Sequence, residues 1–164
     1  MVKITVNGVK LEVEEGTTIL EATKLIGMPV PSICYLEGVH EIGACRVCVV
    51  EIEGLTDLVT ACNNICTEGM VICTNTPKVR EARKLNLQLL ISQHRVNCPM
   101  CYRNGSCRLQ EIVSSMSMKD SYKYKHIYKE EPWDEEEIII RDESKCIKCY
   151  RCATTLVNCS STIF

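Results

Sequence analysis

The stretch CYLEGVHEIGACRVC, residues 34–48, carries three cysteines in fifteen positions, and Cys62 follows after thirteen more residues. A close pair with one distant cysteine on each side allows a loop to wrap around a cluster of two irons, each bound by two thiolates. Gly43 and Ala44 have small side chains, so backbone N–H groups of this loop can point at the sulfurs and tune a reduction potential. A zinc site is the alternative, because Cys-x2-Cys is also half of a zinc knuckle, although a second short-spaced pair is missing.

The composition restricts where such a site can work. The chain has 164 residues and 13 cysteines, an odd number that cannot all pair within one molecule. Its first residues, MVKITVNGVKLEVEEG, lack the basic and apolar regions of a secretory signal, so we expect a reducing cytoplasm in which cysteines serve metals or catalysis. The net charge of -2 removes the electrostatic case for nucleic acid as a partner, and the apolar runs are too short for a membrane span.

The segments around this loop predict a small sheet packed on one helix. VKITVNGVKLEV, residues 2–13, alternates apolar and polar residues on both sides of Asn7-Gly8, which predicts a hairpin with a type I′ turn. TTILEATKLIG, residues 17–27, has helical spacing and ends at a glycine, where helices commonly stop. Three further strands are predicted within residues 47–54, 58–62 and 69–74.

A second kind of structure begins at Thr76-Pro77, with Thr76 as the predicted N-cap and Pro77 at the first helical position. The helix continues through KVREARKLNLQLLISQH, residues 78–94. Its predicted apolar face consists of Val79, Ala82, Leu85, Leu89 and Leu90. A second short helix is predicted around residues 107–116, and residues 119–140 are polar and charge-rich, as in a linker.

The end of the long helix leads into a second group of potential ligands, in the sequence HRVNCPMCYRNGSCRLQ, residues 94–110. His94, Cys98, Cys101 and Cys107 together offer one imidazole and three thiolates. Such a set suits an iron–sulfur cluster, and it equally suits a structural zinc ion of the Cys3His type. The residues alone leave this choice open.

A third group, CIKCYRC, contains Cys146, Cys149 and Cys152 in the C-x2-C-x2-C spacing of bacterial ferredoxins. In that motif a fourth cysteine follows three residues on, but this chain has Leu156 there and Cys159 slightly later. Either Cys159 completes a 4Fe-4S site, or the third site is absent, incomplete or completed by a partner subunit. Cys66 and Cys73 remain without a ligand role, and we expect them to behave as small apolar residues.

The motif PSICYLEGVHEIGACRVC, residues 31–48, resembles the iron–sulfur N-terminal region of three groups of proteins. They are the FeFe hydrogenases, the 75 kDa-type subunit of NADH:quinone oxidoreductase, and the NAD-linked diaphorase and formate dehydrogenase subunits. The resemblance implies a plant-type 2Fe-2S ferredoxin domain of the β-grasp fold, with Cys34, Cys45, Cys48 and Cys62 as its ligands. It also implies a 4Fe-4S cluster held by His94, Cys98, Cys101 and Cys107, and CYRNGSCRLQ is more similar to the hydrogenase and NAD-linked branch.

The predicted fold class is therefore α+β, in four successive parts. Residues 1–76 are expected to form the 2Fe-2S ferredoxin-like domain and residues 77–118 a helical domain with the His-ligated 4Fe-4S site. Residues 119–140 are the predicted linker. Residues 141–164 are expected to be a truncated segment similar to a bacterial ferredoxin, in which Cys146, Cys149, Cys152 and Cys159 could hold a second 4Fe-4S cluster.

The expected function is electron transfer without a catalytic site in this chain. The family resemblance implies a flavin-containing NAD(H) oxidoreductase subunit on one side and a hydrogenase or formate dehydrogenase subunit on the other. One alternative is a zinc-binding or redox-sensing adaptor. Another is a truncated FeFe hydrogenase without its catalytic domain, since only twelve residues follow Cys152 and leave no room for that domain.

Overall fold

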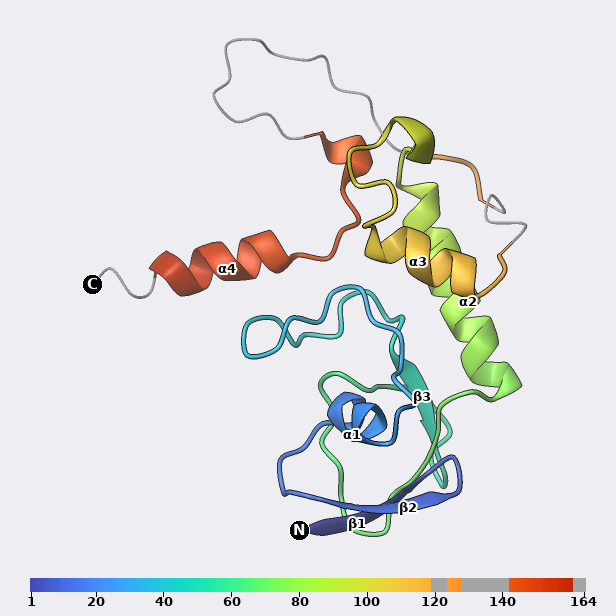
Figure 1. Ribbon diagram of the computed structural model, residues 1–164, viewed down its shortest axis with the longest axis vertical. Helices are drawn as coiled ribbons and strands as arrows, with labels where there is room; N and C mark the ends of the chain where they lie inside the picture. The colour runs from blue at the N-terminus through green and yellow to red at the C-terminus, as the bar shows by residue number, and fades with distance from the viewer. Residues whose placement is uncertain (119–123, 128–141, 161–164) are drawn as a thin grey trace. The chain divides into compact units, whose positions relative to one another are not determined.

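The computed structural model describes residues 1–118, 124–127 and 142–160, the side chains of residues 158–160 excepted. The chain forms two compact units (Figure 1). The first consists of Met1–Arg83 together with Tyr150–Phe164, and the second of Lys84–Cys149. The predicted linker, residues 119–140, lies outside the described residues except for positions 124–127.

The first unit contains a mixed sheet of five strands. These are β1 (Val2–Val6), β2 (Val9–Val13), β3 (Val49–Ile52), β4 (Val59–Thr60) and β5 (Val71–Cys73). Their order is β2-β1-β5-β3-β4, in which β1 and β5 run parallel and the other neighbours run antiparallel. The predicted α+β class is thus confirmed at the level of a small mixed sheet with helices.

Local sequence signals determine the start of this unit. Asn7 and Gly8 adopt positive φ angles of 49° and 85°, so the predicted hairpin turn between β1 and β2 is present. The helix α1 (Ile19–Leu25) begins with a capping box, in which Glu21 N–H donates to Thr18 Oγ1 at 3.2 Å and Thr18 N–H donates to Glu21 Oε2 at 2.9 Å. Both predicted elements are confirmed.

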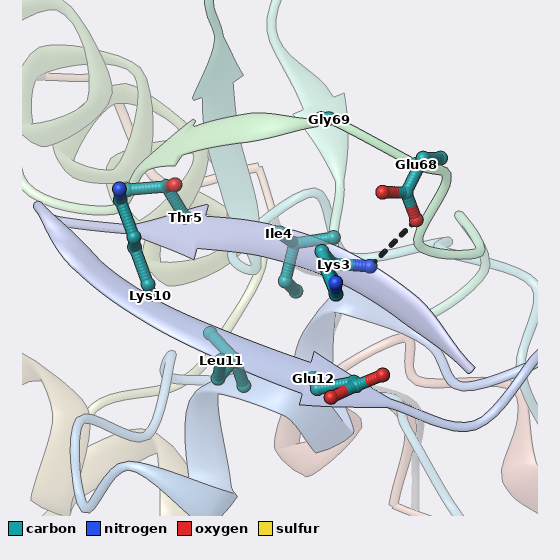
Figure 2. A pocket seen from close by; sticks show the side chains of 8 residues that line it. All are labelled: Lys3, Ile4, Thr5, Lys10, Leu11, Glu12, Glu68 and Gly69. Atoms are coloured by element: carbon teal, nitrogen blue, oxygen red, sulfur yellow. Dashed lines mark hydrogen bonds between the residues drawn. The ribbon is translucent and has the colours of Figure 1, made fainter.

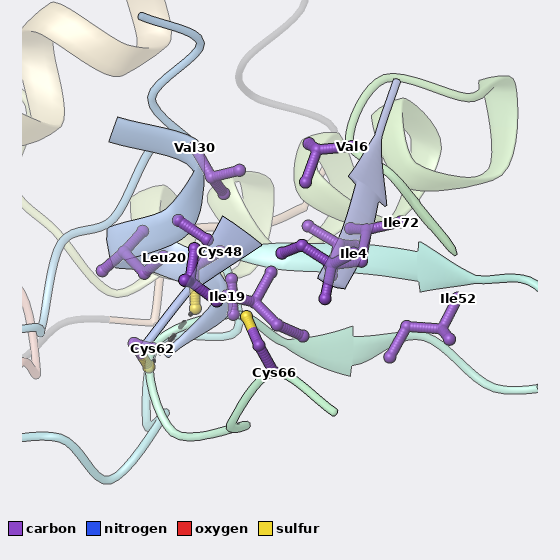
Figure 3. Close-up of a cluster of buried hydrophobic side chains, with 14 of the residues drawn as sticks. Ile4, Val6, Ile19, Leu20, Val30, Cys48, Ile52, Cys62, Cys66 and Ile72 are labelled. Atoms are coloured by element: carbon purple, nitrogen blue, oxygen red, sulfur yellow. Dashed lines mark hydrogen bonds between the residues drawn. The ribbon is translucent and has the colours of Figure 1, made fainter. Parts of the chain in front are cut away.

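The core of the first unit lies between the sheet and α1 (Figure 3). Ile4 and Ile72 contribute from the sheet, and Ile19 from the helix, and each is at most 2% exposed. The fully buried Cys48 and Cys62 belong to the same cluster of side chains. The packing that stabilises the sheet therefore also positions two of the predicted ligands.

The long helix α2 spans Pro77–Ser92, and Thr76 Oγ1 accepts a hydrogen bond of 3.2 Å from Val79 N–H, as predicted for its N-cap. The predicted apolar face is wrong in part, because Leu85 and Leu89 are each 44% exposed. The buried stripe instead recurs at every fourth residue, through Val79, Arg83, Leu87 and Ile91. A pattern based on hydrophobicity missed this stripe because an arginine stands inside it.

Two shorter α-helices and two 3-10 helices, Cys98–Met100 and Glu143–Lys145, complete the described fold. The helix α3 (Arg108–Ser115) confirms the helix predicted around residues 107–116. The helix α4 (Arg151–Ser160) was not predicted, since its β-branched threonines and valine have low helix propensity. Among the described residues, no helix is both long and apolar enough to cross a membrane.

Candidate metal centres

The four cysteines of the first predicted site converge in the first unit. Cys34 and Cys45 lie in the loop between α1 and β3, Cys48 directly precedes β3, and Cys62 follows β4. All four are at most 6% exposed. The pairing of β3 with β4 brings Cys48 and Cys62, which are 14 positions apart, into one buried region.

The four sulfurs are arranged as two pairs. The Sγ atoms of Cys48 and Cys62 lie 3.4 Å apart, and Cys45 N–H donates to Cys34 Sγ at 3.5 Å. Within the described residues, no group of three His, Cys, Asp or Glu side chains is placed to hold one metal ion. Two pairs of thiolates fit two irons bridged by sulfide, because each iron takes two thiolates from the protein.

Within each pair, the shared hydrogen bond lowers the pKa of one thiol and raises the pKa of the other. The side-chain hydrogen bond between Cys34 and Cys45 lowers the pKa of Cys45, and that between Cys48 and Cys62 lowers the pKa of Cys48 to about 7. The same hydrogen bonds raise the pKa values of Cys34 and Cys62, and burial raises them further. Each pair therefore contains one thiol with a lowered pKa, and the thiolate is the form of cysteine that binds iron.

The second predicted site surrounds a cavity of about 260 Å³ in the second unit. His94, at the end of α2, lines this cavity together with Cys98 and Cys107. Apolar side chains, among them those of Ile91 and Leu109, form other parts of its wall. Cys101 lies just beyond the short 3-10 helix Cys98–Met100, is half-buried and does not line the cavity. The structure therefore brings three of the four predicted side chains to one space.

The surroundings of the His94 imidazole suit a metal ligand. Its Nδ1 atom is buried and has no hydrogen-bond partner among the described residues. Burial lowers the pKa of His94, and the positive charge of Lys145 lowers it further. A neutral imidazole with an unpartnered nitrogen is the form that binds iron, so these residues fit a cluster at this position.

A segment distant in sequence packs on the chain next to His94. Arg95 N–H donates to the Ser144 carbonyl at 2.7 Å, and Lys145 Nζ donates to the Arg95 carbonyl at 3.0 Å. Asp142 orders this segment, because its carboxylate accepts from both the N–H and the hydroxyl of Ser144. The chain that leads into the third cysteine group is thereby attached to the second site.

The residues of the third group are divided between the two units. Cys146 and Cys149 are half-buried in the second unit, and Cys152 is exposed on α4 of the first unit. Lys148 N–H donates to Cys146 Sγ at 3.4 Å. Cys159 belongs to α4, but its side chain lies outside the described residues.

Other candidate positions have ordinary surroundings. Cys66 is buried in the core of the first unit, where burial raises the pKa of its thiol, and Cys73 is half-buried in β5.

A groove of about 460 Å³ runs along β1 and β2 and is lined by lysine, glutamate and apolar side chains (Figure 2). None of the predicted ligands lines this groove.

Two arginines that contact the first site were not predicted from the sequence. Arg83 donates from the buried face of α2 to the carbonyl of Val49, next to Cys48. Arg151 donates from α4 to the carbonyl of Cys34. The signal for Arg83 was its place in the stripe of every fourth residue, whereas Arg151 gave no signal beyond lying inside the third cysteine motif.

The fold and the paired cysteines define a protein of the iron–sulfur, ferredoxin-like class. Two family models match the chain: a "2Fe-2S iron-sulfur cluster binding domain" over residues 1–77, and an "NADH-ubiquinone oxidoreductase-G iron-sulfur binding region" over residues 83–121. The chain is therefore similar to these families over residues 1–77 and 83–121, with one matching region for each of the two predicted cluster types.

Several larger proteins contain a similar region. The chain is 35% identical to the NADH-ubiquinone oxidoreductase 75 kDa subunit of Reclinomonas americana, over 93% of its own length and 22% of that protein. It is 38% identical to the NADP-reducing hydrogenase subunit HndD of Solidesulfovibrio fructosivorans, over 94% of its length and 27% of that subunit. The chain thus spans about a fifth to a quarter of these relatives.

A solved structure shares the fold. An NAD+-reducing [NiFe]-hydrogenase in its H2-reduced state aligns with 96% of this chain and 66% of the hydrogenase chain, with a TM-score of 0.82 and 22% identity. The predicted resemblance to iron–sulfur regions of NADH-quinone oxidoreductases and hydrogenases is confirmed by the sequence matches.

Proposed function

We propose that this chain transfers electrons between two redox partners through a 2Fe-2S cluster and a 4Fe-4S cluster. Each cluster, when bound, accepts and releases single electrons, and the protein supplies burial, orientation and hydrogen bonds. The observation that carries the proposal is the pairing of four buried cysteines in a chain whose two regions match iron–sulfur families.

Cys34, Cys45, Cys48 and Cys62 are the proposed ligands of the 2Fe-2S cluster. Their division into two close pairs supports the assignment of Cys34 with Cys45 to one iron and Cys48 with Cys62 to the other. The strand order β2-β1-β5-β3-β4, with a parallel β1/β5 pair, supports the finer assignment of this domain to the β-grasp fold.

His94, Cys98, Cys101 and Cys107 are the proposed ligands of the 4Fe-4S cluster. The shared cavity of three of these side chains and the unpartnered Nδ1 of His94 support the assignment. Cys101 completes the set only if its side chain turns toward the cavity when the cluster binds. A neutral imidazole in place of a thiolate makes this site less negative, which favours a higher reduction potential.

The proposed third site consists of Cys146, Cys149 and Cys152, completed either by Cys159 or by a partner subunit. The proposed domain boundaries are residues 1–76 and 77–118, followed by a linker over 119–140 and the segment 141–164. The start of α2 at Pro77 and the end of α3 at Ser115 support the second domain.

The proposed partners are a flavin-containing NAD(H) oxidoreductase subunit and a terminal hydrogenase or formate dehydrogenase subunit. The names of the relatives, which include NADP-reducing and NAD+-reducing hydrogenases, support this pairing. A direct check is NADH-driven reduction of the cluster-loaded chain, followed by visible absorbance, with and without an added flavin-containing NADH oxidoreductase. Reduction that needs the flavoprotein supports the proposal, and its absence in both samples contradicts the partner assignment.

The experiment that tests the clusters is anaerobic determination of iron, sulfide and zinc in one sample, with low-temperature EPR after reduction by dithionite. About six irons per chain, with signals of one two-iron and one four-iron centre, support the two main sites. About ten irons indicate that the third site is also filled. Zinc with little iron would refute electron transfer and favour an adaptor.

A further inference from the structure

Two arginines from outside the sheet contact the peptide groups that carry the paired cysteines. Arg151, the first residue of α4, donates through Nη2 to the carbonyls of Ile33 and Tyr35 at 2.6 and 2.7 Å, and through Nε to the carbonyl of Cys34 at 3.1 Å. One guanidinium therefore binds three consecutive carbonyls around a proposed ligand. These contacts join residues 116 to 118 positions apart, all within the first unit.

The second contact involves the other pair of cysteines. Arg83 is 7% exposed, and its Nη2 donates to the carbonyl of Val49 at 2.8 Å, directly after Cys48. Its Nε atom is buried and has no hydrogen-bond partner among the described residues. Burial lowers the pKa of Arg83 to about 10, so the group is still charged at neutral pH, and the negative charge of Cys48 acts in the opposite direction.

A buried guanidinium with incomplete hydrogen bonding is costly unless a negative group lies beside it. The four sulfurs of the first site provide that negative group once iron and sulfide are bound. Uptake of one electron from a reductant adds one more negative charge there, and no bond forms or breaks. A fixed positive charge stabilises this reduced state more than the oxidised state, and burial strengthens the effect.

We propose, building on the proposed function, that Arg83 and Arg151 are positioning residues that raise the reduction potential of the 2Fe-2S centre, one for each cysteine pair. Their hydrogen bonds hold the two positive charges at the peptides next to Cys48 and Cys34. A further contact holds α4 against the loop that contains Cys34, because His40 Nδ1 and Thr154 Oγ1 lie 2.6 Å apart. The helix α4 is thus part of the 2Fe-2S site, although it lies in the third cysteine group of the sequence.

The test is an EPR-monitored redox titration of the full, cluster-loaded chain with Arg83→Gln and Arg151→Gln, which keep an N–H donor but lose the charge. Each variant should lower the midpoint potential of the 2Fe-2S signal, and Arg83→Lys and Arg151→Lys should restore most of it because they keep the positive charge. Arg80→Gln is the matched control, since this exposed arginine of α2 donates to the Asn75 carbonyl instead. It should leave the potential unchanged, and the 4Fe-4S signal should serve as an internal reference in every sample.

Each outcome decides the proposal. Unchanged potentials in both glutamine variants would overturn it, as would an equal shift in the control. Loss of the 2Fe-2S signal from the glutamine and lysine variants alike would overturn it, because the fork geometry rather than the charge would then be required. A wild-type sample without any 2Fe-2S signal would refute the proposed function and this inference together.

Discussion

The loop before Cys45 contains two glycines with nearly the same backbone conformation but different surroundings. Gly38 has a φ of 67° and Gly43 a φ of 66°. A Cβ atom at position 38 would meet nothing within 4 Å, whereas one at position 43 would lie 3.1 Å from Thr60 Oγ1 and 3.3 Å from Asn63 Nδ2. Substitution of the two glycines by alanine therefore separates backbone strain from crowding.

The expected loss of stability follows from these contacts. Left-handed backbone costs an alanine about 1–2 kcal/mol, which is the whole expected effect of Gly38→Ala. At Gly43 the neighbours cannot easily move apart, because the Thr60 hydroxyl donates to the Asn63 side-chain oxygen and Thr60 is 3% exposed. Crowding in a packed site adds about 1–3 kcal/mol, so Gly43→Ala should lose about 2–5 kcal/mol in total.

The assay is urea unfolding of both variants and the wild-type protein under anaerobic conditions, followed by circular dichroism. Gly43→Ala should unfold with an equilibrium constant about 5- to 150-fold larger than that of Gly38→Ala. It should also lose its visible cluster absorbance faster, and Thr60→Ala in the same chain should recover part of the stability. Equal stability of the two glycine variants would refute the argument that packing against Thr60 and Asn63 restricts position 43.

Three further predictions concern α1 and the two cluster sites. Hydrogen bonds from Thr18 lower the pKa of Glu21, so its contribution to stability is present at neutral pH and is lost as the pH falls through that lowered value. Glu21→Gln should therefore cost about 0.3–1 kcal/mol at pH 7 and less as the pH falls toward 3, as measured by urea unfolding at both pH values. Cys66→Ala should lose about 1 kcal/mol of stability but keep the full iron content, whereas Cys62→Ala should lose the 2Fe-2S signal; equal iron loss in both would contradict the assignment. His94→Cys adds a negative charge to the second site and should lower the 4Fe-4S midpoint potential in a redox titration, and an unchanged potential would show that the imidazole does not set it.

Short-range chemistry made much of the fold predictable. The turn at Asn7-Gly8 and the N-cap at Thr76 depend on residues within a few positions of each other, and the structure confirms both. The apolar face of α2 was less predictable, because Leu85 and Leu89 are exposed while Arg83 is buried. Burial of a charged residue depends on what the rest of the chain places opposite it, so the hydrophobic pattern of one helix cannot show it.

The sequence by itself determined the strands, the first helix boundaries and the spacing of cysteines suited to iron–sulfur clusters, since these depend on local geometry and ligand chemistry. Only the tertiary structure decided that the Sγ atoms of Cys48 and Cys62 lie 3.4 Å apart, because that distance depends on strand pairing between β3 and β4. It also decided that Arg151 binds the carbonyls around Cys34. Contacts between residues more than a hundred positions apart arise from folding of the whole unit, because loop closure must bring them together before any hydrogen bond can form.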